Sequence, residues 1–282
     1  MAAQLVDRMV SIGDGIDLHY VEAGEGRPLV IIPSWSLTGA AYRHQLQGLS
    51  GTRRVMAFDM RGHGDSTTPA GGYRVSRLAA DLRAVIERLG LDEVDLMGHS
   101  IGSSIVWSYI DLFGEDRLGR LIFVDQAPSV TAKADWSAQE RVTYGCLLPD
   151  LDALAEFYLQ VLAAETPEAT VPVIARLFSP SLPAAELLWF AREICKLPRR
   201  HAADLLHDHC GLDWRDVIER VRRPTLVVGA EASIFSAESQ RWIADRIPGA
   251  EVEIFKAEDG GSHFMCYENP TKFNALVDAF LA

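Results

Sequence analysis

The sequence lacks an excess of positive charge. It holds 27 Lys and Arg residues against 39 Asp and Glu residues, which gives a formal net charge of -12 at pH 7. Proteins that bind nucleic acids draw much of their affinity from clustered basic side chains, which displace counterions from phosphates. We therefore expect no nucleic-acid partner, and we interpret the acidic balance as a contribution to solubility.

Cysteine is scarce, and long apolar runs are missing. Cys146, Cys195, Cys210 and Cys266 form no C-x-x-C pair, so neither a disulfide framework nor a zinc site is indicated, and we expect no metal and no other cofactor. A membrane-spanning helix needs about 18 consecutive apolar residues, and no segment provides them. Residues 1–8 also lack the apolar stretch of a secretory signal. These absences predict a cytoplasmic protein with reduced thiols and no membrane partner.

The sequence does contain short apolar runs that alternate with helical patterns. Its 282 residues and 48% hydrophobic content suffice for one large core. The apolar runs are typical of strands buried on both faces of a parallel sheet. The alternation predicts an α/β fold, with a wound, mostly parallel sheet and helices on both faces. The predicted strands are 27–33, 55–58, 94–97, 121–124, 225–228 and 251–255, and the predicted helices are 40–49, 75–89, 101–113, 239–247 and 271–281.

Two segments depart from this alternation. Residues 9–21 alternate apolar and polar side chains around Gly13-Asp14-Gly15, as expected of an antiparallel hairpin at a sheet edge. Residues 125–224 contain helix formers, aromatic residues and prolines, which predicts a helical lid inserted between two strands. We therefore divide the chain into a first part of the core at 1–128, a lid at 129–212 and a second part of the core at 213–282.

A G-x-S-x-G motif, Gly98-His99-Ser100-Ile101-Gly102, lies between a predicted strand and a predicted helix. A serine hydroxyl needs a base to become a nucleophile, and a sharp strand-to-helix turn exposes its oxygen. Small residues at both ends of the motif let the strand and the helix approach each other. We predict that Ser100 is a nucleophile and that the side chain of His99 points away from it.

The motif and three further segments resemble the α/β-hydrolase superfamily. These segments are Phe58–Ser66, Val124–Pro128 and Gly261–Pro270, and the resemblance extends over nearly the whole chain. It implies an eight-stranded sheet, and it implies that His263, in a Gly-rich loop before the last helix, is the general base for Ser100. It also implies that Arg61, His63 and Asp65 belong to a structural corner beneath the site.

The same resemblance implies an oxyanion hole built from two backbone N–H groups. By position, these belong to Ile101, which follows the nucleophile, and to Trp35, in the loop after the third strand. That loop has Pro33-Ser34 where the family usually has His-Gly. A backbone donor does not depend on the side chain, so we expect Trp35 to keep this role.

The acid of the triad is not where most relatives carry it. A histidine base needs an acceptor on its second nitrogen, yet the usual position after the seventh strand is Ala232. Asp125, at the end of the sixth strand, and Glu231 are the two candidates. We prefer Asp125, because the carboxyl edge beside the elbow strand is where wound sheets assemble their sites. Glu231 would need a remodelled turn.

These residues predict hydrolysis of a carboxylic ester or lactone of an apolar small molecule by a serine-type esterase or lactonase. An acid after the sixth strand also resembles zearalenone-type lactonases and cofactor-independent dioxygenases of 3-hydroxy-4-quinolones, in which a His/Asp pair deprotonates the substrate. Other segments resemble non-haem chloroperoxidases. A small-molecule receptor on a hydrolase scaffold is a third hypothesis.

Residues 207–210 and the aromatic residues of the predicted lid each have a structural interpretation as well as a functional one. The sequence His207-Asp208-His209-Cys210 is similar to a metal-ligand cluster, but a solvated helix end is the commoner origin of such a polar patch. The aromatic residues of the predicted lid favour an apolar substrate, and packing between lid helices explains them equally well. A homodimer remains open as a partner.

Overall fold

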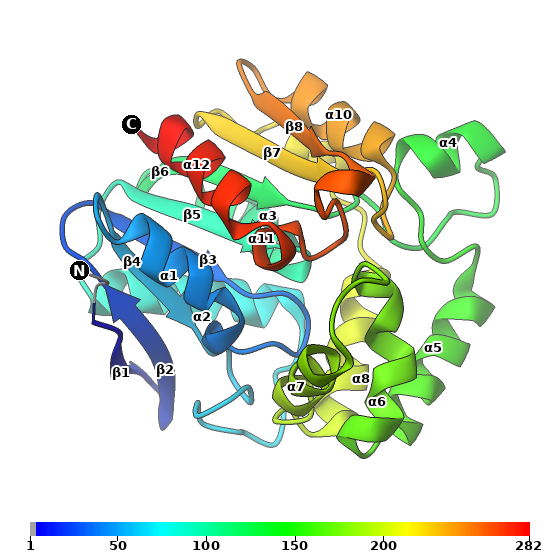
Figure 1. Cartoon of the computed structure of the whole chain (residues 1–282), viewed down its shortest axis with the longest axis horizontal. Helices are drawn as coiled ribbons and strands as arrows, with labels where there is room; N and C mark the ends of the chain where they lie inside the picture. The colour runs from blue at the N-terminus through cyan, green and yellow to red at the C-terminus, as the bar shows by residue number, and fades with distance from the viewer. Residues whose placement is uncertain (1–3) are drawn as a thin grey trace.

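The computed structural model describes residues 4–282, which form an eight-stranded sheet in the order β1-β2-β4-β3-β5-β6-β7-β8 (Figure 1). The hairpin of β1 (Val6–Gly13) and β2 (Ile16–Ala23) is antiparallel, as predicted, and β2 also pairs antiparallel with β4. All other neighbours are parallel. The predicted α/β class with a mostly parallel sheet is therefore confirmed.

The central strands are buried because both faces of the sheet are covered. β3 (Pro28–Ile32), β4 (Arg54–Phe58), β5 (Val94–His99), β6 (Leu118–Val124) and β7 (Thr225–Ala230) follow the predicted apolar runs. β8 (Glu251–Phe255) is the edge strand and stays partly exposed. The hydrophobic pattern therefore predicts both the strands and their burial.

Helices cover the two faces of the sheet. α1 (Arg43–Leu49) packs against α12 (Pro270–Leu281) on the near face in Figure 1, and α2 (Val75–Arg88) packs against α3 (Ile101–Phe113) on the far face. α10 (Ala237–Arg246) packs against β7 and β8. The predicted helix 40–49 begins as a 3₁₀ turn, Gly39–Tyr42.

A long helical insertion separates β6 from β7. α5 (Leu151–Ala163), α6 (Pro167–Ile174), α7 (Ala184–Ile194) and α8 (Arg199–Cys210) gather at one end of the sheet (Figure 1). α4 (Ala138–Thr143) instead packs against α10, and α9 (Arg215–Ile218) packs against α3. The boundaries 1–128, 129–212 and 213–282 stay a prediction, and the first three residues of that division lie outside the described residues.

The parallel strands point the loops after β3, β5, β6 and β7 toward the same edge of the sheet. In wound sheets, this carboxyl edge is where binding sites form. None of the helices described between residues 4 and 282 is both long and apolar enough to cross a bilayer.

Candidate active site

Ser100 lies on a sharp turn between β5 and α3. Its backbone has φ 54° and ψ -124°, a strained conformation for a residue with a side chain. A Cβ on Gly98 would lie 2.5 Å from the carbonyl carbon of Gly102, and a Cβ on Gly102 would lie 2.2 Å from the carbonyl oxygen of Ile32. The two glycines of the motif are thus required by the close approach of the helix to the sheet. This packing holds the strained serine.

His263 and Asp125 form a buried hydrogen-bonded pair. His263 Nδ1 lies 2.6 Å from Asp125 Oδ2, and both side chains are almost completely buried. Burial lowers the pKa of His263 to about 3, and it raises the pKa of Asp125 well above its usual value. When Asp125 is ionised, its carboxylate can only accept, so that in this state Nδ1 carries the proton and Nε2 keeps its lone pair. The pair can therefore take a proton through Nε2.

The other candidate acid, Glu231, is placed elsewhere. Its side chain is exposed, and Oε2 accepts a hydrogen bond from the backbone N–H of Ala257 at 3.2 Å. Asp125 instead ends β6 with φ 46°, and its own N–H donates to Val228 O at 2.8 Å. The geometry therefore favours Asp125 as the partner of His263.

Ser233 is a member of this group that sequence reasoning missed. It stands in the turn after β7, and its hydroxyl donates a hydrogen bond to the same Oδ2 of Asp125 that contacts His263. This bond counteracts the rise in the pKa of Asp125 that burial causes. The signal was present in the sequence as a hydroxyl one residue after Ala232, in the turn where an acid was sought.

The backbone N–H groups of Ile101 and Trp35 are the two donors predicted for the oxyanion hole. Ile101 is the first residue of α3, so its N–H has no acceptor within the helix. Within residues 4–282, the Trp35 N–H is not paired with a backbone acceptor either. The indole Nε1 of Trp35 donates to the carbonyl of Ala202 in α8 at 2.9 Å, so this loop is tied to the lid helices. The oxyanion role of the two N–H groups stays a prediction.

His99 links the loops on either side of the site, and its side chain points to them as predicted. His99 Nε2 lies 2.9 Å from the backbone oxygen of His263, and Nδ1 lies 2.8 Å from Tyr42 Oη. A carbonyl can only accept, so Nε2 carries the proton and the Tyr42 hydroxyl donates to Nδ1. Tyr42 Oη in turn accepts the N–H of Ser34 at 2.9 Å. This series of hydrogen bonds connects the Trp35 loop to the His263 loop.

Ser100 and His263 line a common cavity, which we call the triad cavity. It encloses about 600 Å³ of space, part of it open to solvent. Trp35 also lines it, and most of its remaining surface is apolar and comes from the insertion between β6 and β7. The remaining lining residues are Ser34, Val130, Leu147, Phe157, Val173, Ile174, Arg176, Leu177, Ile194, Leu206, His209, Cys210, Ile234, Phe235 and Phe264.

The interpretation of His207–Cys210 as a solvated helix end is wrong for two of its residues. His207 is exposed, but His209 is only 5% exposed and lines the triad cavity together with Cys210. Burial, followed by the nearby charge of His263, lowers the pKa of His209 to about 3. The helical period places residues 206, 209 and 210 on one face of α8, but the sequence does not indicate which face is covered.

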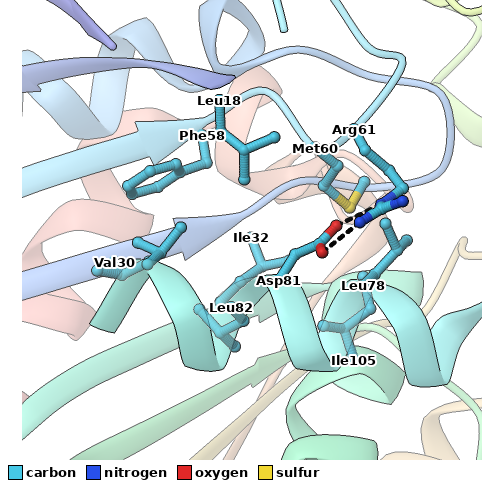
Figure 2. Close-up of a pocket in the computed structure, with 11 residues that line it drawn as sticks. Leu18, Val30, Ile32, Phe58, Met60, Arg61, Leu78, Asp81, Leu82 and Ile105 are labelled. Atoms are coloured by element: carbon cyan, nitrogen blue, oxygen red, sulfur yellow. Dashed lines mark hydrogen bonds and ion pairs between the residues drawn. The ribbon is translucent and has the colours of Figure 1, made fainter. Parts of the chain in front are cut away.

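A second cavity of about 370 Å³ lies between the sheet and α2 (Figure 2). It is lined by apolar side chains and by Arg61 and Asp81, whose two hydrogen bonds are 2.5 Å long. Burial raises the pKa of Asp81. The described lining residues include neither a serine nor a histidine. This cavity therefore lacks a serine nucleophile and a histidine base among its described lining residues, and Arg61 pairs with Asp81 here.

His19, Asp59 and Asp65 are the described side chains close enough together to approach one metal ion. Both nitrogens of His19 already contact carboxylates, Asp59 at 2.9 Å and Asp7 at 3.1 Å. Asp59 also accepts the backbone N–H of Gly39 at 2.7 Å and that of Asp65 at 3.1 Å. These hydrogen bonds explain the cluster as a structural corner.

The chain is similar in sequence to proteins that are named non-heme chloroperoxidases. It is 36% identical over 123 residues to the non-heme chloroperoxidase CPO-A1 of Kitasatospora aureofaciens, a match that covers 43% of this chain and 45% of that protein. This match spans less than half of the relative. A putative non-heme chloroperoxidase of Synechocystis sp. is 25% identical over 271 residues, which are 94% of this chain and 95% of that protein.

The fold is similar to solved structures as well. An esterase, EaEST, from Exiguobacterium antarcticum superposes with a TM-score of 0.87 at 22% identity, and the match covers 98% of this chain and 100% of that one. The family model for the alpha/beta hydrolase fold matches residues 27–270. Because that match extends from β3 to the start of α12 and includes the serine turn, the chain belongs to the alpha/beta hydrolase family.

Proposed function

We propose that this chain hydrolyses a carboxylic ester or lactone of an apolar small molecule through an acyl-enzyme on Ser100. The observation that carries the proposal is the hydrogen bond of 2.6 Å between His263 Nδ1 and Asp125 Oδ2, next to a cavity that Ser100 also lines. The apolar surface of that cavity supports an apolar substrate. The proposed setting is the cytoplasm, with neither a nucleic acid nor a membrane as partner.

The reaction proceeds in two halves. In the first, Ser100 Oγ attacks the substrate carbonyl while His263 Nε2 takes its proton, and Asp125 stabilises the imidazolium that forms. The N–H groups of Trp35 and Ile101 hold the tetrahedral oxyanion. When the intermediate collapses, the C–O bond to the leaving group breaks, and His263 returns the proton to that oxygen. In the second half, His263 activates water, which releases the acid from Ser100.

Active-site labelling tests this proposal. An organophosphonate probe that carries a fluorophore should label the wild-type chain in a one-to-one ratio, and Ser100→Ala should abolish both the label and ester turnover. Ser104→Ala is the matched control, because Ser104 is a buried serine on the same helix whose hydroxyl lacks a partner among residues 4–282. Full turnover by Ser100→Ala would refute the acyl-enzyme.

A cofactor-independent dioxygenase is the alternative. The observation that favours it is again the His263–Asp125 pair after β6, which could deprotonate the hydroxyl of a 3-hydroxy-4-quinolone. Ser100 would then orient the substrate. Oxygen consumption with release of carbon monoxide, retained in part by Ser100→Ala, would establish this reaction in place of hydrolysis.

A further inference from the structure

The triad cavity contains two polar groups that the proposed hydrolysis does not use. One is His209 on α8, and the other is Arg176 in the 3₁₀ turn Ala175–Leu177 after α6. Both come from the insertion between β6 and β7, whereas Ser100 follows β5 and His263 lies in the loop before α11 (Met265–Glu268). A buried polar group such as the His209 ring is unfavourable unless it has a partner. A ligand in the cavity could supply that partner and could contact Arg176 as well.

His209 is buried without a partner for one of its nitrogens. Its side chain is 5% exposed, and Nδ1 has no hydrogen-bond partner among residues 4–282. Leaving such a nitrogen unpaired disfavours the folded state. A neighbour on the same helix, His207, is exposed and stacks edge-on against Tyr158 instead. His209 therefore combines an unpartnered buried nitrogen with a side chain that lines the triad cavity.

Arg176 brings a positive charge to the same cavity. Its guanidinium carbon lies 5.1 Å from the ring centroid of Phe157, another lining residue, and within residues 4–282 no carboxylate lies within 4.0 Å of it. Desolvation lowers the pKa of Arg176, with no carboxylate to offset it. Much of the side chain stays exposed to solvent, which places the charge at the rim. The described lining includes no Asp or Glu.

The charge of Arg176 extends to the triad, because it helps to lower the pKa of His263. A substrate anion beside Arg176 would therefore compensate a charge that otherwise acts on the catalytic base. An arginine also binds a carboxylate through two parallel hydrogen bonds, which adds geometric selectivity.

We propose that Arg176 and His209 bind a carboxylate on the substrate, so that the enzyme prefers esters or lactones whose apolar body carries a second, ionised carboxyl group. The preference among esters rests on the proposed hydrolysis. Binding of a carboxylate in the cavity does not require that reaction. The two residues determine specificity and take no part in the chemical steps.

Two matched esters test the preference. Mono-p-nitrophenyl adipate differs from p-nitrophenyl hexanoate by a carboxylate in place of the terminal methyl group. Hydrogen bonds to charged groups contribute about 1.5 to 3 kcal/mol, so the adipate should have a kcat/KM about tenfold or more above that of the hexanoate. Arg176→Gln should remove this preference, so that the ratio of kcat/KM on the adipate to kcat/KM on the hexanoate falls to about one. The controls are Arg192→Gln, an exposed arginine of α7, and His207→Gln.

His209 has its own variants. His209→Phe keeps a ring of similar shape without a hydrogen-bonding nitrogen, and it should lower kcat/KM on the adipate about fivefold, close to the value of one hydrogen bond. His209→Gln should retain part of the rate. If His209→Phe lowered kcat/KM equally on both esters, His209 would have only a packing role among the inserted helices. That result would remove His209 from the proposal.

A binding measurement separates this inference from the proposed function. In the Ser100→Ala background, 4-phenylbutyrate should bind more tightly than its neutral amide by calorimetric titration, and Arg176→Gln should equalise the two. Equal affinities, or a difference that survives Arg176→Gln, would overturn the carboxylate site whether or not the enzyme cleaves esters. If neither ester is cleaved and no probe labels Ser100, the hydrolase proposal fails, yet a carboxylate preference in this titration would still support the site.

Discussion

The two sides of the triad cavity differ in how their polar groups are partnered. On the sheet side, His263 is bonded to Asp125, and His99 connects the loops of Ser34 and His263 through Tyr42. On the side of the inserted helices, His209 Nδ1 has no hydrogen-bond partner, and Arg176 has no carboxylate, among residues 4–282. The difference suggests a division of labour in which the sheet fixes the reacting groups and the helices select the substrate.

Among the variants that test this difference between the two sides, Asp125→Asn should lower kcat the most. An amide at this position can donate to His263 Nδ1 and so stabilise the wrong tautomer, and we expect kcat to fall about 10⁴-fold. Glu231→Gln is the control, since Glu231 bonds to the backbone of Ala257, and it should change kcat less than twofold. Steady-state kinetics on a p-nitrophenyl ester measures both. A large loss in Glu231→Gln with little change in Asp125→Asn would reverse the assignment of the acid.

Ser233→Ala should have a smaller effect on the same side of the cavity. Loss of its hydrogen bond to Asp125 leaves a buried carboxylate with fewer donors, so the pKa of Asp125 should rise further. We expect kcat to fall about tenfold, close to one hydrogen bond to a charged group, with KM unchanged. Ser239→Ala provides a control from α10, whose hydroxyl bonds to Ser236 O. An unchanged kcat in Ser233→Ala would show that Asp125 does not depend on this donor.

The smallest expected effect is the contribution of His209, on the inserted helices, to the pH dependence of the free energy of unfolding. The pKa of His209 is about 3 in the folded state and ordinarily 6.5, so between these values the unfolded chain binds the extra proton. The free energy of unfolding should therefore fall as the pH drops from 6.5 toward 3, by at most about 1.4 kcal/mol per pH unit for this residue. Urea titrations at pH 7.5 and 5.5 should show a smaller difference for His209→Gln than for the wild type. His207→Gln should keep the wild-type difference.

The fold was largely predictable because its strands are buried on both faces. An apolar run such as Leu121–Val124 has few alternatives to a central strand, and the two glycines beside Ser100 follow from the closeness of helix and sheet. The docking of α4 on α10 was not predictable, since it depends on exposed polar contacts such as Thr143 to Glu238. Patterns within one segment carry no information about such distant partners.

More of the candidate site could be predicted on the sheet side of the triad cavity than on the side of the inserted helices. Ser100 and His263 stand in motifs, and Asp125 ends a strand next to the elbow, so position along the sheet suffices to bring them together. Ser233 was missed because the sequence was searched for an acid, whereas the fold uses a hydroxyl to support an acid from the neighbouring strand. His209 was misplaced because the covered face of α8 depends on how the inserted helices pack. The roles of all these residues in catalysis stay predictions.

Trp35 connects the loop after β3 to the inserted helices. Its main chain follows β3, while its indole donates to the carbonyl of Ala202 on α8. If the inserted helices moved away, the indole would exchange this protein acceptor for water, which disfavours the open state by about 0.5 to 1.5 kcal/mol, the net value of one hydrogen bond. A movement of the inserted helices would therefore also release one of the contacts that position the loop after β3.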